Sequence, residues 1–154
     1  MAKAKSPIPE GFRALTPHIT VKGAVNYIDF LKRAFNGVEL RRAPAPDGRL
    51  MHAEVRIGDS ILMFNDDFPE YHPQPIAEGR WPFVLQLYVP DADATFAQAV
   101  AAGCEVTFPL ADQFWGDRYG HVRDPFGVTW AIATHTEDLT PEEMKQRQAA
   151  AGHA

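Results

Sequence analysis

The sequence predicts an α+β fold in which two βαβββ modules form an open, barrel-like sheet with a cleft. Two observations predict it. The apolar pattern of residues 21–35 returns at residues 89–103, and a glycine follows each helical segment. Strand-like runs then close both halves, where Met63 and Trp130 lie 67 residues apart. Two similar half-domains that face one another enclose a cleft, so the repeat indicates a binding site as well as a fold.

The first module, residues 14–65, has the element order strand, helix and three strands. The expected elements are a strand within 14–22, a helix over 24–35, and strands over 38–43, 50–58 and 60–65. Apolar side chains recur at helical spacing in the helix, and Gly37 is its expected left-handed cap. The segment 50–58 alternates between apolar and polar residues, which predicts a half-buried strand that turns at Gly58 into its partner.

The second module, residues 82–134, repeats this order. We expect a strand over 83–89, a helix over 92–102, strands over 104–108, 117–123 and 128–133, and a loop over 109–116. Asp91 is a candidate N-cap for the helix, and Asp124 to Gly127 form a turn between the last two strands.

Three segments lie outside the modules. Residues 1–13 are rich in proline and lysine and are expected to be flexible, and residues 66–81 form a polar linker between the modules. The tail, residues 139–154, carries a short helix over 141–150, because Thr140 and Glu143 form a capping box around Pro141.

The composition limits the class of protein. A chain of 154 residues fits one domain, over 14–138, and its net charge of −5 argues against a nucleic-acid-binding surface. No run approaches the roughly 20 apolar residues that span a membrane. The start lacks the apolar core of a secretory signal, and the single cysteine, Cys104, cannot form an internal disulfide. We therefore expect a cytoplasmic protein.

The opening PHITVKGAVNYIDFLKRAFN and the segment FWGDRYGHVRDPFGVTWAIATHTED resemble the vicinal oxygen chelate superfamily of glyoxalases, bleomycin-resistance proteins and extradiol dioxygenases. The resemblance covers residues 14–138 and is greatest to the PhnB-like branch. It implies the glyoxalase/bleomycin-resistance fold, a small-molecule ligand, and a homodimer with clefts at or near the subunit interface. It does not select a reaction, because isomerases, lyases, dioxygenases and drug binders share this fold.

The resemblance also locates the metal-binding positions of the catalytic members, where glyoxalase I uses two histidines and two glutamates. In this chain the four positions fall on residues that cannot serve as such ligands: Thr16, Phe64 or a neighbour, Val84 and Ala131. We therefore expect no metal and no other cofactor. A divalent metal held by displaced ligands is the alternative.

A few polar side chains can still support chemistry. His52 and Glu54 share one face of a strand and can act as a base and the residue that orients it, or as half of a metal site. His18 is expected to lie in the same cleft, with His121 as a further member. The alternatives are a hydrogen-bonded structural histidine at His18 and a solvent-facing ion pair completed by Arg56.

Other side chains are expected to line the cleft. Gln86 and Tyr88 share the face of Val84, and Trp115 is expected as a stacking surface beside Arg118, which would pair with Asp117. The linker contains acidic residues that would attract a cation: Asp66, Asp67, Glu70 and Glu78.

These features favour a protein that sequesters a flat aromatic or cationic compound in a cleft lined by Phe64, Val84, Gln86, Tyr88, Trp115 and Ala131. The competing class is an enzyme, a metal-dependent or metal-free lyase, isomerase or dioxygenase that uses His18, His52 and Glu54.

Overall fold

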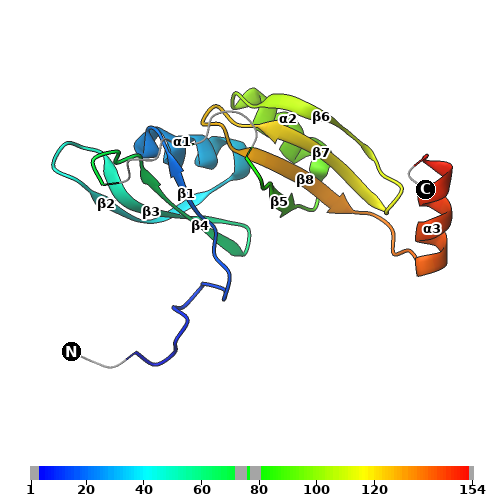
Figure 1. Ribbon diagram of the computed structural model, residues 1–154, viewed down its shortest axis with the longest axis horizontal. Helices are drawn as coiled ribbons and strands as arrows, with labels where there is room; N and C mark the ends of the chain where they lie inside the picture. The colour runs from blue at the N-terminus through cyan, green and yellow to red at the C-terminus, as the bar shows by residue number, and fades with distance from the viewer. Residues whose placement is uncertain (1–3, 72–75, 77–80, 153–154) are drawn as a thin grey trace. The chain divides into compact units, whose positions relative to one another are not determined.

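The computed structural model describes residues 4–71, 76 and 81–152. The chain divides into two compact units, Met1–Ala77 and Glu78–Ala154. Each unit contains one four-stranded mixed sheet with a helix packed against it (Figure 1). The predicted α+β class and the two βαβββ modules are confirmed. Parts of the expected linker, residues 72–75 and 77–80 with Glu78 among them, lie outside the described residues.

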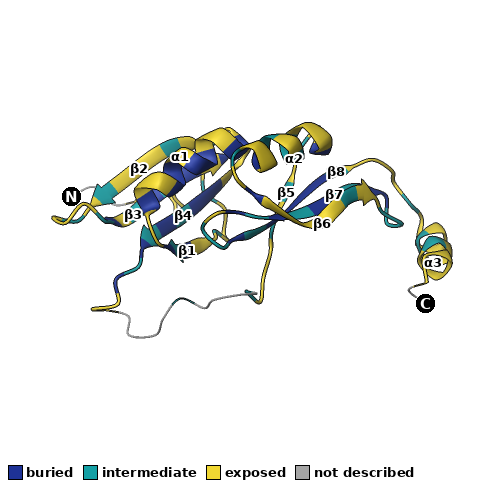
Figure 2. Ribbon diagram, turned by 90° about the horizontal axis from the view of Figure 1, so that it is seen from above, coloured by how far each residue is buried: buried dark blue, intermediate teal, exposed yellow. Residues whose placement is uncertain are grey.

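The first unit forms a sheet with the strand order β1-β4-β3-β2. Its elements are β1 (His18–Val21), α1 (Ala24–Phe35), β2 (Val38–Pro44), β3 (Leu50–Ile57) and β4 (Ser60–Asp66). Strand β1 pairs parallel with β4, and the other pairs are antiparallel. Helix α1 covers one face of this sheet, and buried residues concentrate between them (Figure 2). The ring centroids of Tyr27 on α1 and Phe64 on β4 lie 5.1 Å apart there.

The end of α1 differs from the prediction. Asn36, with φ of 55°, is the left-handed cap, so the assignment of that role to Gly37 is wrong. Gly37 serves close packing instead, because a Cβ atom there would lie 2.8 Å from Val55 Cγ1 and 3.0 Å from the Leu31 carbonyl oxygen.

The second unit forms a sheet with the strand order β5-β8-β7-β6. Its elements are β5 (Leu85–Tyr88), α2 (Ala92–Ala101), β6 (Glu105–Asp112), β7 (Asp117–Arg123), β8 (Thr129–His135) and α3 (Pro141–Ala150). Strand β6 extends through half of the segment that we expected to be a loop, because residues 111 and 112 still pair with β7. Among the helices of the described ranges, none has the length and apolar character needed to cross a membrane.

In both units, a side chain on a strand accepts a hydrogen bond from the first residue of the helix that packs on the sheet. In the first unit, Asp66 at the end of β4 accepts a hydrogen bond from the Ala24 backbone N–H at 2.9 Å. In the second unit, Thr134 on β8 accepts one from the Ala92 backbone N–H at 2.8 Å. Asp66 is only 6% exposed, so our assignment of this carboxylate to an acidic linker rim is wrong.

Candidate functional site

The first unit carries a polar face on the side of its sheet away from α1. The register places His18 beside Met63 and Met63 beside Glu54, so these side chains share a face. Phe64, one residue further along β4, faces α1 and is fully buried. The expectation that Phe64 lines the ligand cleft is therefore corrected, because it belongs to the core.

Hydrogen bonds fix the orientation of His18. The side-chain amide nitrogen of Asn65 donates to the Asp66 carbonyl oxygen at 2.7 Å, so the Asn65 side-chain oxygen faces His18 Nε2 at 3.0 Å. That oxygen can only accept, which assigns a proton to His18 Nε2. The neutral ring then has its lone pair on Nδ1.

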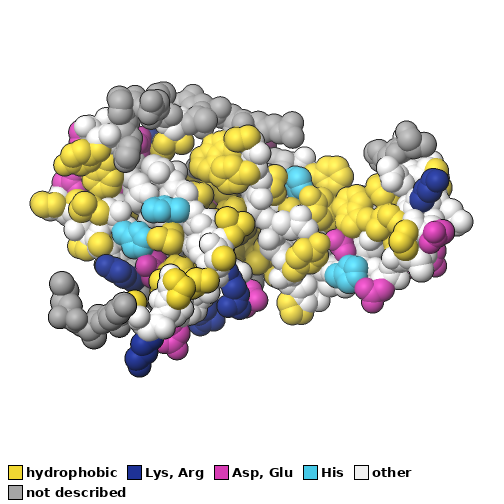
Figure 3. Space-filling view, turned by 60° about the horizontal axis from the view of Figure 1, so that its bottom comes forward, with side chains coloured by type: hydrophobic (Ala, Val, Ile, Leu, Met, Phe, Trp, Pro, Cys, Tyr) yellow, Lys and Arg dark blue, Asp and Glu magenta, His cyan; other side chains and the backbone are white. Residues whose placement is uncertain are grey.

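The predicted pair of His52 and Glu54 is present. His52 Nε2 donates to Glu54 Oε1 at 2.9 Å, and both side chains are largely buried. The His18 and His52 rings meet edge to face, with centroids 5.7 Å apart. Figure 3 shows two histidine side chains together on one face of this unit. Arg56 does not complete an ion pair with Glu54, since it donates to the Gly58 carbonyl oxygen.

A hollow of about 320 Å³ adjoins this polar face. It is lined by His18, Met51, Asn65, Phe68 and Tyr71. Glu70, which precedes Tyr71 in the chain, is paired with Arg49, whose guanidinium also stacks on Phe68 at 4.1 Å. This ion pair offsets the charge that we expected Glu70 to offer to a cationic ligand.

The second unit carries an aromatic face on the side of its sheet away from α2. Gly120 faces α2, because a Cβ atom there would lie 2.9 Å from the Phe96 ring. Alternation and register then place the following residues on the opposite face: Gln86, Tyr88, Asp117, Tyr119, His121, Ala131 and Ala133. The sequence prediction that Gln86, Tyr88 and Ala131 share a face agrees with this register.

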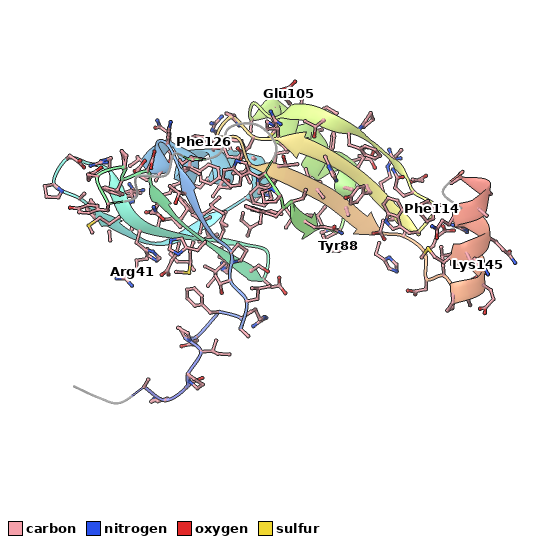
Figure 4. All side chains as sticks on the ribbon, viewed as in Figure 1. Arg41, Tyr88, Glu105, Phe114, Phe126 and Lys145 are labelled. Atoms are coloured by element: carbon pink, nitrogen blue, oxygen red, sulfur yellow. The ribbon has the colours of Figure 1, made fainter. Side chains whose placement is uncertain are left out.

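Aromatic rings contact one another across this face. Trp115 meets Tyr119 at 5.2 Å, and Phe108 meets His121 at 5.6 Å. Tyr88 projects from the end of β5 (Figure 4). Its side chain is 58% exposed, and that of Phe108 is 43% exposed. Ala131 and Ala133 are fully buried and add little bulk to the face.

Burial favours the neutral form of two ionisable groups on the aromatic face. Burial, with the nearby charge of Asp117, raises the pKa of Tyr119, and burial lowers the pKa of His121. The Tyr119 hydroxyl lies 2.6 Å from His121 Nε2, so the two groups share a hydrogen bond.

One buried carboxylate anchors this face. Asp117 is 3% exposed and accepts hydrogen bonds from the Tyr88 hydroxyl at 3.0 Å, Trp115 Nε1 at 3.1 Å and His135 Nδ1 at 2.7 Å. The predicted pair of Arg118 with Asp117 is wrong. Successive side chains of a strand alternate, so Arg118 points toward α2 and donates to Asp93 at 2.8 and 2.9 Å. Arg118 therefore does not line the aromatic face.

The positions that bind metal in the resembling family do not fit a metal here. Thr16 donates to the Arg13 carbonyl oxygen, Phe64 is in the core, and Ala131 has no donor atom. Val84 lines a hollow of about 280 Å³ with Trp81, Pro82 and Phe83. Within the ranges that the structure describes, no three His, Cys, Asp or Glu side chains are grouped so that they could hold a metal ion.

Sequence reasoning missed Asn65 and His135, and it assigned Asp117 only as the partner of Arg118. Asn65 follows Met63 by two positions on the polar face and could have been found by alternation. Asp117 and His135 pair across β7 and β8, and only the register of those strands brings them together.

Comparisons with known proteins agree with this architecture. An uncharacterized protein of Mycobacterium bovis is 41% identical over 143 residues, which are 90% of this chain and 94% of that protein. The crystal structure of TioX from Micromonospora superposes with a TM-score of 0.62 at 28% identity, covering 80% of this chain and 98% of TioX.

A PhnB protein from Bacillus cereus has a TM-score of 0.63 at 15% identity, over 79% of this chain and 99% of that one, which is a likeness of fold alone. The family model described as Glyoxalase/Bleomycin resistance protein/Dioxygenase superfamily matches residues 16–132. With both βαβββ units in place, the chain belongs to the glyoxalase/bleomycin resistance protein/dioxygenase superfamily.

Proposed function

We propose that this protein binds a flat, partly apolar small molecule, neutral or cationic, on the aromatic face of its second unit, and breaks no bond in it. The observation that carries the proposal is the pair of Tyr88 and Trp115, whose polar ends are held by one buried carboxylate. Aromatic side chains fixed in this way offer contact area at low entropic cost.

The surroundings of the face support this ligand class. Tyr88 and Phe108 leave aromatic surface exposed on a sheet, where it would favour a stacked ligand. Aromatic ring faces attract cations, typically by about 0.5–1 kcal/mol at exposed sites. The negative charge of Asp117 on this face is offset by its neighbour His135. Among the described residues of the face, the preference for a cation would therefore come mainly from the aromatic rings.

A second candidate function is metal-free acid–base catalysis on the polar face of the first unit. The oriented pair of His52 and Glu54 favours it, because a carboxylate bonded to Nε2 stabilises the imidazolium that forms when Nδ1 takes a proton. His18, with its lone pair on Nδ1, would be a second acceptor of substrate hydrogen bonds.

The first experiment is a fluorescence titration with proflavine, a flat cationic tricycle, and with anilinonaphthalene sulfonate as an anionic aromatic counterpart. We expect proflavine to bind more tightly. Trp115→Ala should weaken proflavine about fivefold or more, since an aromatic contact of this kind contributes roughly 1 kcal/mol. Leu15→Ala, an exposed apolar side chain of the first unit, is the control.

Variants of the first unit separate the two candidate functions. If Tyr71→Ala weakens proflavine and Trp115→Ala does not, the ligand occupies the hollow beside His18 and the proposed face is wrong. If a compound that binds is also converted, and His52→Ala or Glu54→Gln abolishes that turnover, the protein is an enzyme and sequestration is refuted.

The proposal includes a homodimer in the cytoplasm. Apolar side chains on one edge strand of each sheet support self-association: Val38 and Leu40 on β2, and Val106 on β6. The single cysteine, Cys104, supports a reducing compartment. Light scattering at micromolar concentration should give twice the chain mass, and a monomeric mass would refute the dimer.

A further inference from the structure

The Asp117 carboxylate is one end of a charged array that also contains His135 and Asp138. His135 Nδ1 lies 2.7 Å from Asp117 Oδ1, and its Nε2 lies 3.0 Å from Asp138 Oδ1. Ionised carboxylates only accept hydrogen bonds, so both ring nitrogens carry protons in this geometry. His135 is therefore an imidazolium between two carboxylates.

The groups that face His135 are known from each neighbouring element. Asp117 comes from β7, and Asp138 comes from the segment after β8. Asp117 in turn accepts hydrogen bonds from the Tyr88 hydroxyl of β5 and from the Trp115 indole of the β6–β7 turn, both neutral donors. Hydrogen bonds to Asp138 and to Asp117 raise the pKa of His135, and partial desolvation opposes this rise.

Backbone bonds connect the same segment to the turn that carries Trp115. The Gly116 carbonyl oxygen accepts from the Thr136 N–H at 2.9 Å and from the Glu137 N–H at 3.0 Å. Gly116 has φ of +93°, and a Cβ atom there would lie 2.5 Å from the Glu137 carbonyl oxygen, so only glycine fits this approach. The segment that carries His135 and Asp138 is therefore joined by backbone hydrogen bonds to the turn that carries Trp115.

We propose that Asp117 is a positioning residue, which holds Tyr88 and Trp115 in the orientation that the ligand requires, and that protonation of His135 sets how far the negative charge of this carboxylate is neutralised. The inference rests on the function proposed above. When His135 loses a proton, the neutral ring can donate to one carboxylate only. Asp117 keeps that bond because it is buried, and the exposed Asp138 is released. The indole of Trp115 then donates to a carboxylate whose charge is less neutralised.

The array can be observed without any ligand through the indole N–H resonances of 15N-labelled protein. Trp130 is an internal control, because its Nε1 donates at 3.0 Å to a different carboxylate, Asp124. Asp117→Asn should shift the Trp115 resonance upfield and leave that of Trp130 in place. Raising the pH should move the Trp115 resonance with a midpoint above 6.5, and His135→Gln should abolish that titration. Trp115→Phe assigns the peak.

Ligand binding is then compared between two matched variants. Asp117→Asn should weaken proflavine about fivefold, the change expected when roughly 1 kcal/mol of aromatic contact is lost. Asp112→Asn, which removes an exposed carboxylate bonded to Arg118, should leave it unchanged.

Each outcome decides a separate point. An unshifted Trp115 resonance in Asp117→Asn, or equal proflavine affinity in the two variants, would overturn the positioning role. A Trp115 resonance that does not follow pH would overturn the role of His135. If proflavine does not bind the wild type while the resonances behave as expected, the proposed function fails and the array stands. His135→Gln keeps the test valid if Asp117→Asn does not fold, since His135 is 53% exposed.

Discussion

Replacing Asp66 by asparagine should strongly destabilise the first unit. Asp66 Oδ1 accepts from the backbone N–H groups of Gly23 and Ala24, and Oδ2 accepts from that of Leu50 at 2.7 Å. Asparagine can keep the two bonds at the start of α1, but its amide nitrogen then faces the Leu50 N–H, donor against donor. Leu50 is 1% exposed, so its N–H loses its acceptor in the interior.

The magnitude follows from two contributions. An orphaned buried N–H costs about 1–3 kcal/mol, and removing a negative charge from a helix N-terminus costs about 0.3–1 kcal/mol. Gly23 and Asp66 also line a hollow of about 520 Å³, through which water can reach the site. We therefore expect a loss of about 2 kcal/mol, in the lower part of the summed range.

The assay is urea denaturation followed by circular dichroism at pH 7. Asp67→Asn is the matched control, and it should change the free energy of unfolding by less than about 0.5 kcal/mol, as is usual for surface substitutions. If the Asp66 variant is as stable as the control, then the three backbone bonds are not what joins α1 to the sheet.

Three further predictions concern reactivity, acid stability and metal content. Burial, together with the charge of Asp124, raises the pKa of Cys104 to about 12, so iodoacetamide at pH 8 should alkylate this thiol slowly in the folded protein and rapidly in urea; equal rates would show that it is exposed. A hydrogen bond from Arg42, with a smaller one from Lys32, lowers the pKa of Glu39 from 4.5 to about 2. A depressed pKa stabilises the folded state above pH 4.5, and that contribution is lost as pH falls through about 2. Glu39→Gln should therefore be less stable than the wild type at pH 7, by under about 1 kcal/mol because solvent screens this partly exposed pair, and the difference should be nearly gone at pH 2. Elemental analysis should find no stoichiometric divalent metal, and a chelator should leave the thermal midpoint unchanged; one bound metal per chain would contradict both expectations.

The order of the elements was predictable because it depends on short-range patterns. Helical spacing located α1 and α2, and the alternation of residues 50–58 located β3 with its correct polar face. The end of α1 was not predictable in the same way, since either Asn36 or Gly37 can adopt a left-handed conformation. The structure places Asn36 in that conformation, and the space at Gly37 is limited by Val55, a residue of another element that no local pattern reveals.

The candidate site was predictable only where neighbours along the chain also meet in space. His52 and Glu54 are two residues apart on one strand, so alternation placed them together. Phe64 was assigned to the wrong face because a one-residue shift in a strand exchanges its two faces. Arg118 was assigned to Asp117 by adjacency, although successive residues of a strand point in opposite directions, and its partner Asp93 lies on α2.

The parallel pairing of β1 with β4 has a consequence for how each unit folds. The hairpin of β3 and β4 closes over a short turn at residues 58 and 59, whereas His18 and its partner Met63 are 45 residues apart. Each doubling of loop length adds about 0.6 kcal/mol of closure entropy, so this pairing costs about 2 kcal/mol more than the hairpin. The second unit repeats the separation, with Leu85 paired to Trp130. Within the first unit, β1 is therefore the first strand to be synthesised and the last to gain its partner, β4.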